Sequence, residues 1–146
     1  MRLKLKKISV VVPMYLEEAV AKICYNRLVQ VLNELKKYEY EIIFVNDGST
    51  DNTLNILEEI AKVDKNIKVI SFSRNFGHQN AVTAGLKYVS GDLAIIIDAD
   101  LQDPPEIIPK MVELWEQGNE VIYGKRKKRK GESTFKLLSA KIFYQT

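Results

Sequence analysis

The amino-acid sequence predicts an α/β protein, a three-layer α/β/α sandwich with a mainly parallel sheet. Short runs of β-branched residues alternate with amphipathic stretches of helical length, which is the order expected when crossover helices join parallel strands. The expected strands also end in polar loops, as the ligand-binding edges of such sheets do. With 146 residues, the chain suits a single domain with a sizeable core.

The expected strands are short apolar runs closed by a proline or by turn residues. The run ISVVV ends at Pro13, and the run EIIFV is followed by the turn-rich segment NDGSTDN. Because the carboxyl ends of parallel strands meet at one edge, the loops PMYLE, NDGSTD, SRNFG and DADLQD should lie together. The five expected strands span residues 8–12, 41–45, 67–72, 92–98 and 120–124.

The expected helices show apolar residues at helical spacing. They lie between Val20 and Leu35, between Leu54 and Ala61, near residues 78–89, and from Pro104 to about Gln117. Proline is tolerated in the first turn, which fits the start of the fourth helix. A final amphipathic helix is expected from Phe135, Leu138, Ile142 and Phe143.

The composition, 46% hydrophobic and 28% charged, is that of an ordinary globular protein. No apolar stretch approaches the ~20 residues that cross a bilayer, and the N-terminus does not resemble a signal peptide. The single Cys24 is expected in the core of a protein in a reducing, cytosolic setting. The lone His78 excludes a multi-histidine metal site, so a divalent metal would need oxygen ligands, which points to Mg²⁺ or Mn²⁺.

Positive charge is concentrated in two segments. Arg2, Lys4, Lys6 and Lys7, together with the six bases of residues 125–130, account for ten of the 22 Lys and Arg residues. Such clusters suit phosphate groups, an anionic membrane surface or nucleic acid, and a solvated loop is the simpler alternative. Nucleic acid is not expected as a partner, since the basic run lacks the interleaved aromatic residues that stack on bases.

Glycine-rich phosphate-binding loops are missing from the sequence. The seven glycines form neither G-x-G-x-x-G nor G-x-x-x-x-G-K-[ST]. A bound diphosphate would therefore need another source of positive charge, which a metal ion held by carboxylates would supply.

Two carboxylates follow the most apolar expected strand, in the segment IIIDADLQDPPE. At the end of a strand Asp98 and Asp100 should point to the same face, with Ala99 turned inward. Two like charges so close repel each other unless a cation lies near them, so a divalent metal is expected here. The alternative is that Asp98 and Asp100 organise a turn.

Three other polar residues are candidates for the site. Asp47 follows the second strand, where it would bind a ribose or base edge, or organise the Gly48 turn. Arg74 follows the third strand and would line a base, or pair with Asp47 or Asp98. His78, at an expected helix start, is interpreted as a structural group that supports the site rather than as a catalytic base.

Five segments together resemble family 2 glycosyltransferases, with a closer likeness to the branch that loads sugars onto polyprenyl phosphates. They are VVVPMYLEE, IIFVNDGSTDNT, SRNFGHQNAVTAGL, GDLAIIIDADLQDPPE and VIYGKRKKRKGES. The resemblance implies the Rossmann-like sheet of the GT-A fold. It also implies a metal-dependent enzyme that transfers a hexose from a UDP- or GDP-sugar to a polyprenyl phosphate, with inversion at the anomeric carbon. Residues 1–146 would be the N-terminal, donor-binding part of its catalytic domain, with the chain continuing past Thr146.

The same resemblance implies roles for individual residues. Asp98, Asp100 and Arg126 would be catalytic, with Asp98, Asp100 and Gln102 at the metal. The nucleotide-sugar pocket would be lined by Pro13, Tyr15, Glu17, Asp47, Arg74 and Asp98. The acceptor phosphate would meet Arg126, Lys127, Arg129 and Lys136. One position departs from the family pattern: Leu16 stands where the family usually has Asn.

The other basic residues would rest on anionic lipid at the cytoplasmic face of a membrane. Two alternatives to the transferase remain at this point. One is a nucleotide-sugar-binding fragment without activity. The other is a phosphatase of the haloacid-dehalogenase type, which also has D-x-D after an apolar strand, but on its first strand and with Thr or Val where this chain has Gln102.

Overall fold

The computed structural model describes residues 5–100, 104–119, 121–129 and 132–140, with the backbone alone for the last two ranges. The chain forms two compact units, residues 1–105 and residues 106–146. Each unit is described by itself.

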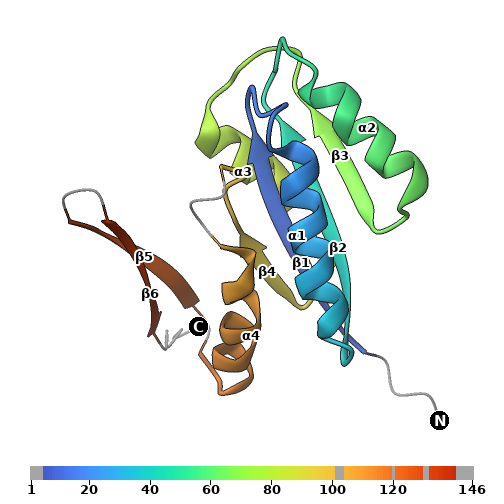
Figure 1. Cartoon of the computed structure of the whole chain (residues 1–146). Helices are drawn as coiled ribbons and strands as arrows, with labels where there is room; N and C mark the ends of the chain where they lie inside the picture. Colours follow the sequence, from blue (N-terminus) through green and yellow to red (C-terminus); the bar gives the residue numbers. More distant parts are fainter. Residues whose placement is uncertain (1–4, 101–103, 120, 130–131, 141–146) are drawn as a thin grey trace, which may run out of the picture. The chain divides into compact units, whose positions relative to one another are not determined.

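The first unit contains a four-stranded parallel sheet in the order β3-β2-β1-β4 (Figure 1). Its strands are β1 (Lys6–Met14), β2 (Tyr38–Asn46), β3 (Ile67–Ser71) and β4 (Leu93–Ile96). The predicted parallel sheet is therefore confirmed. The first strand runs one residue past Pro13, and β4 ends two residues before Asp98.

Helices cover both faces of this sheet. The helices α1 (Ala21–Glu34) and α2 (Thr53–Val63) lie on one face, and α3 (His78–Lys87) lies on the other (Figure 1). The predicted three-layer α/β/α arrangement is confirmed. None of the helices in the described part of the chain is long and apolar enough to span a membrane.

The core is built on β1 and β2, whose side chains are buried on both faces. Such near-continuous apolar strands are typical of a parallel sheet covered by helices. On the α3 face, Val11 and Val45 form a cluster with Ala81. A Cβ placed on Gly85 of α3 would lie 2.4 Å from Cγ1 of Val11 and 3.2 Å from Cγ2 of Val45. Glycine at this position therefore lets the helix approach the sheet closely.

Pro13 explains why β1 and β4 separate at their carboxyl ends. Val11 is the last residue of β1 paired with β4, and its carbonyl oxygen accepts the N–H of Ile97 at 3.0 Å. Backbone groups alternate sides along a strand, so Pro13 faces the same edge of β1 two residues later, but it has no N–H to donate. The ladder cannot continue there, and the chain after Ile97 is released to form the acidic loop.

A buried carboxylate ties the strands together at the opposite, amino end of the sheet. The Glu41 side chain is 2% exposed, and its Oε2 accepts hydrogen bonds from Ser9 Oγ at 2.6 Å and from the Ser90 amide at 2.7 Å. Lys68 Nζ lies 2.7 Å from Oε1. Burial alone would raise the pKa of Glu41, but the ion pair with Lys68 and the hydrogen bonds from Ser9 and Ser90 outweigh it and lower that pKa to about 2.

A short 3-10 helix, Pro105–Ile107, spans the boundary between the units, and α4 (Ile108–Glu116) follows in the second unit. The second unit ends in an antiparallel hairpin of β5 (Val121–Arg129) and β6 (Glu132–Ala140). The predicted strand at 120–124 is thus longer than expected, and it is paired in a separate two-stranded sheet. The interpretation of residues 125–130 as a loop is wrong for 125–129, which continue β5.

The predicted final helix is also wrong, because Phe135 and Leu138 lie in β6. The other two residues used for that prediction, Ile142 and Phe143, lie outside the described residues. A helical pattern read from four positions is weak beside a hairpin, in which the pairing partner is the nearest segment in sequence.

The Glu41 network predicts a specific pH dependence of stability. A carboxyl whose folded pKa is lowered contributes fully above its unfolded pKa of about 4.5, and this contribution is lost as pH falls towards about 2. The shift corresponds to roughly 3 kcal/mol at neutral pH. In urea unfolding, Glu41→Gln should have a lower free energy of unfolding than wild type at pH 7. The difference in unfolding free energy between the two proteins should be less than half as large at about pH 3 as at pH 7.

Glu39→Gln is the matched control, since Glu39 is exposed on the same strand and should change little at either pH. An equal difference between wild type and Glu41→Gln at pH 7 and pH 3 would contradict this account of the network.

Candidate functional site

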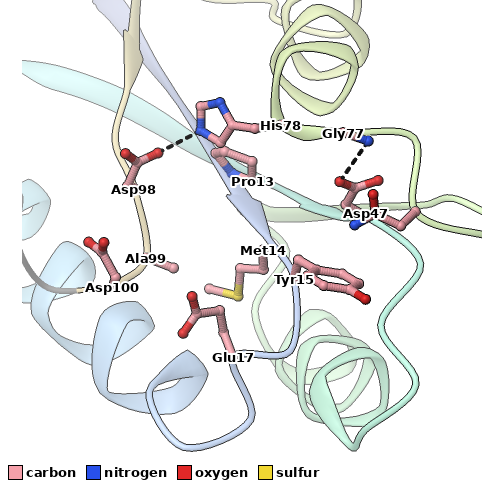
Figure 2. Close-up of a pocket in the computed structure, with 11 residues that line it drawn as sticks. Pro13, Met14, Tyr15, Glu17, Asp47, Gly77, His78, Asp98, Ala99 and Asp100 are labelled. Carbon is pink, nitrogen blue, oxygen red and sulfur yellow. Dashed lines mark hydrogen bonds and ion pairs between the residues drawn. The ribbon is translucent and has the colours of Figure 1, made fainter.

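A pocket of about 310 Å³ lies at the carboxyl edge of the parallel sheet (Figure 2). Parallel sheets bind ligands at this edge, where the loops leave the strands. Segments that follow β1, β2, β3 and β4 all contribute to it. The lining residues are Pro13, Met14, Tyr15, Glu17, Asp47, Asn75, Gly77, His78, Asp98, Ala99 and Asp100.

Asp47, which follows β2, organises the loop that follows β3. Its side chain is 3% exposed. Oδ1 accepts the N–H of Phe76 at 2.7 Å. Oδ2 accepts the N–H of Gly77 at 3.1 Å (Figure 2). A buried carboxylate is costly unless its oxygens accept hydrogen bonds, and here both do. Asp47 therefore builds one wall of the pocket and also lines it.

Gly48 makes the same loop contact possible from the backbone. Its φ is +70°, and a Cβ at this position would lie 2.1 Å from the backbone carbon of Arg74 and 2.4 Å from the nitrogen of Asn75. No side chain fits there, so the turn after β2 and the loop after β3 are in direct backbone contact. The Gly48 turn and the ligand pocket, which the sequence left as alternatives for Asp47, are parts of one arrangement.

Arg74 itself is not among the residues that line the pocket, although its neighbour Asn75 is. Its guanidinium lies over the ring of Phe76, 4.3 Å from the ring centroid. Such a stack is a favourable use of a planar cation. The hydrogen bonds to Asp47 come from backbone amides rather than from this guanidinium.

The acidic loop follows β4, and its residues 99 and 100 lie in a turn. Ile97 and Ala99 are buried, Asp98 is partly exposed, and Asp100 is exposed. The prediction that Ala99 turns inward is confirmed, and both carboxylates belong to the pocket. Gln102, the third predicted metal ligand, lies outside the described residues.

His78 connects α3 to the acidic loop. Its Nε2 lies 2.8 Å from Oδ1 of Asp98, and both side chains are partly open to solvent, at 64% and 42% exposure (Figure 2). The interpretation of His78 as a group that supports the site agrees with this contact. Sequence spacing alone did not show that Asp98 is its partner.

Negative charge gathers at the mouth of the pocket. Burial and then the charges of Asp100, Asp51 and Asp98 raise the pKa of Glu17 above its usual value. A cation would relieve this repulsion. Among the residues whose side chains are described, no three His, Cys, Asp or Glu side chains form a metal-binding group. Asp98 and Asp100 supply carboxylate oxygens, the donor type that Mg²⁺ and Mn²⁺ prefer.

The family model for glycosyl transferase family 2 matches residues 9–145 of this chain. The chain belongs to this family. Its fold and the loops at the pocket are therefore those of a glycosyltransferase domain, and the phosphatase alternative is set aside.

Several curated transferases are similar to this chain. The chain is 52% identical to the uncharacterized glycosyltransferase YkcC of Bacillus subtilis over 94% of this chain and 42% of the relative. It is 44% identical to a bactoprenol glucosyl transferase of Shigella phage SfX, over 95% of this chain and 45% of that protein. It is 40% identical to an undecaprenyl-phosphate 4-deoxy-4-formamido-L-arabinose transferase of Proteus mirabilis, over 95% and 42%. The chain thus spans less than half the length of these relatives.

Solved structures of glycosyltransferases share the fold. The mannosyltransferase PcManGT from Pyrobaculum calidifontis aligns with a TM-score of 0.58 and 21% identity, over 66% of this chain and 28% of that protein. Residues 1–349 of S. aureus TarS, solved with UDP-GlcNAc, align with a TM-score of 0.50 and 27% identity, over 77% and 32%.

The pocket brings together most of the predicted nucleotide-sugar residues, namely Pro13, Tyr15, Glu17, Asp47 and Asp98, and also Asp100. Their roles in binding and catalysis stay predictions. The predicted acceptor residues Arg126, Lys127, Arg129 and Lys136 lie on the hairpin of the second unit, where the backbone alone is described.

Leu16 shows why the departure from the family pattern matters. Its φ is +54°, in the left-handed region that Asn and Gly tolerate better than other residues. Its N–H donates to Ser49 Oγ at 3.0 Å, and its side chain is 45% exposed, so little burial offsets the strain. The family's usual Asn suits this backbone conformation, whereas leucine is strained in it.

Because of this strain, glycine at position 16 should give a more stable protein than alanine, the reverse of the usual order. In urea unfolding, Leu16→Gly should be more stable than Leu16→Ala by about 1 kcal/mol, because only alanine keeps the left-handed penalty. At Glu58, an exposed position inside α2, the order should be the normal one, with alanine better than glycine. A Leu16→Ala variant at least as stable as Leu16→Gly would show that the backbone is not strained there.

Proposed function

We propose that the pocket binds a nucleotide-diphosphate sugar together with Mg²⁺ or Mn²⁺, and that the complete protein transfers the hexose to a polyprenyl phosphate. One observation carries the proposal above all. In a family 2 chain, Asp98, Asp100 and Glu17 gather negative charge at the carboxyl edge of the sheet, beside the pocket wall built by Asp47.

The donor part of the proposal has two supports. The pocket offers an exposed aromatic side chain, Tyr15, beside the polar groups of Asn75 and Asp47, which suits a nucleoside with its flat base and its hydroxyl groups. The structure of TarS, which is similar to this chain, was solved with UDP-GlcNAc. A choice between UDP- and GDP-sugars does not follow from either support, so both are tested below.

The metal part of the proposal follows from charge. A diphosphate approaching Asp98 and Asp100 would be repelled, and the sequence contains neither of the glycine-rich phosphate-binding motifs that would offset this repulsion. Asp98 and Asp100 would hold the metal, with Gln102 as the further ligand that the family resemblance implies. When bound, the metal would stabilise the charge of the departing nucleoside diphosphate.

In the proposed reaction, an oxygen of the acceptor phosphate attacks the anomeric carbon from the side opposite the donor's diphosphate. A bond from that oxygen to carbon forms as the carbon–oxygen bond to the diphosphate breaks, which inverts the anomeric configuration. A phosphate is already ionised near neutral pH, so it needs alignment more than a strong general base. The chain's own part is to hold the donor in the pocket so that its anomeric carbon is presented to the acceptor.

The acceptor part of the proposal rests on the relatives, two of which carry bactoprenol or undecaprenyl phosphate in their names. The basic hairpin is the candidate surface for the lipid phosphate and for anionic lipid at the cytoplasmic face of a membrane. Successive residues of a strand belong to opposite faces, so Lys127 and Arg129 share the face of Lys125, and Arg126 does not. Lys136 of β6 is paired with Lys125 and therefore lies on the same face as Lys125. Residues 127, 129 and 136 therefore share one face of the hairpin, while residue 126 belongs to the other.

Calorimetric titration of the chain with UDP-glucose, UDP-GlcNAc and GDP-mannose, each with and without Mn²⁺, tests the donor and metal parts. At least one sugar nucleotide should bind about tenfold more tightly with Mn²⁺, which corresponds to about 1.4 kcal/mol. Asp100→Asn should lose this gain, because it removes a carboxylate at the proposed metal site.

Asp92→Asn is the matched control, since Asp92 directly precedes the other end of the same strand, and it should keep the gain. Metal-dependent binding that survives in Asp100→Asn would contradict the assignment of the metal site. Failure of every sugar nucleotide to bind the wild type would contradict the donor assignment.

A further inference from the structure

We infer that Thr53 is a positioning residue of the pocket: its buried hydroxyl holds the loop of residues 15–18, which carries Tyr15 and Glu17 to the donor. This inference rests on the proposed function, because it assigns a purpose to a contact behind the donor pocket. Thr53 does not line the pocket, and nothing in the sequence pattern singles it out.

The hydroxyl lies at the junction of two segments that are distant in sequence. Thr53 is the first residue of α2, and it is 0% exposed. The N–H of Glu17 donates to Thr53 Oγ1 at 2.9 Å. Thr53 Oγ1 in turn lies 2.5 Å from Oδ1 of Asp51. The loop after β1 and the start of α2 are thus joined through one oxygen atom.

The direction of these hydrogen bonds follows from the chemistry of the partners. An ionised carboxylate only accepts, so the single hydroxyl hydrogen of Thr53 is donated to Asp51. The hydroxyl oxygen is then the acceptor for the Glu17 amide, which can only donate. Hydrogen bonds from Thr53 lower the pKa of Asp51, against the effect of burial, so Asp51 stays ionised and keeps this direction at neutral pH.

Neighbouring amides of the same loop end on the same segment. The Leu16 N–H donates to Ser49 Oγ at 3.0 Å, and the Glu18 N–H donates to Asp51 Oδ2 at 3.3 Å. A hydrogen bond also runs in the opposite direction: Oε2 of Glu18 accepts the N–H of Asn52 at 2.9 Å. Three consecutive amides of the loop, at residues 16, 17 and 18, are therefore held by side chains of residues 49–53.

Of these three contacts, only the one between the Glu17 amide and Thr53 is made by a fully buried side chain. Ser49 and Asp51 are partly exposed, so water can replace their hydrogen bonds at small cost, whereas it has no access to Thr53. The loop needs such an anchor, because Leu16 is in a strained conformation and Glu17 lies among like charges that repel it. Without the Thr53 hydroxyl as acceptor, the side chains of Tyr15 and Glu17 should no longer be held in their positions at the pocket.

The test compares Thr53→Val, which keeps the shape and loses the hydroxyl, with Thr53→Ser, which keeps the hydroxyl. Thr83→Val is the matched control: the Thr83 hydroxyl donates to the carbonyl of Gln79 within α3, on an exposed surface. Calorimetry with the sugar nucleotide that binds the wild type gives the dissociation constant. Amide hydrogen exchange of residues 16–18 gives the state of the loop.

Thr53→Val should raise the dissociation constant about five- to tenfold and speed exchange at the Glu17 amide, while exchange at the buried β1 amides stays slow. Thr53→Ser should restore both readouts, and Thr83→Val should change neither. Ser49→Ala acts on the same loop from a partly exposed position, so it should produce a smaller rise in the constant even where Thr53→Val fails to fold.

Two outcomes separate the failure of this inference from that of the proposed function. If the wild type binds a sugar nucleotide and both Thr53→Val and Ser49→Ala bind it as tightly, the positioning role is wrong while the donor assignment stands. If the wild type binds none of them, the donor assignment is wrong and the positioning role falls with it. A Thr53→Ser variant as weak as Thr53→Val would also contradict the inference, since it would show that the hydroxyl is not what matters.

Discussion

The pocket depends on a single carboxylate that belongs to one loop and holds another. Asp47 follows β2, yet its two oxygens accept the N–H groups of Phe76 and Gly77 after β3. Beside it, Gly48 has no side chain, so the backbones of the two loops touch. These contacts fix the loop that leads into α3, and His78 at the start of that helix lies 2.8 Å from Oδ1 of Asp98.

The two ends of the sheet are built differently, and the difference suits a binding protein. At the amino end, Glu41 is enclosed by hydroxyls, an amide and ammonium groups, so the strands are locked together. At the carboxyl end, Pro13 stops the β1–β4 ladder, and the loops are then held by side chains from neighbouring loops. Functional groups on loops supported by a rigid sheet are typical of α/β enzymes. The strain at Leu16 is tolerated because this support surrounds it.

Much of this fold follows from local sequence patterns. The buried runs around Val11 and Ile43 predict strands, and the D-x-D spacing correctly predicts an inward Ala99 between two pocket carboxylates. What the sequence patterns did not predict is which strand or which hydrogen-bond partner a residue contacts. Phe135 and Leu138 suggested a helix, but the adjacent strand pairs with them. The partners of Asp47 lie 29 and 30 residues away and are backbone amides, which leave no trace in side-chain pattern. Thr53 was missed for the same reason, since its partner is the amide of Glu17.

Asp47 builds the pocket through its hydrogen bonds from the Phe76 and Gly77 amides. Amide hydrogen exchange of Asp47→Asn tests this claim most directly, because an asparagine has one acceptor oxygen for the two N–H groups. Exchange at one or both amides should become at least about tenfold faster than in wild type, and sugar-nucleotide affinity should fall in parallel. Wild-type exchange at both amides, with affinity lost, would contradict the claim and assign Asp47 to direct ligand contact alone.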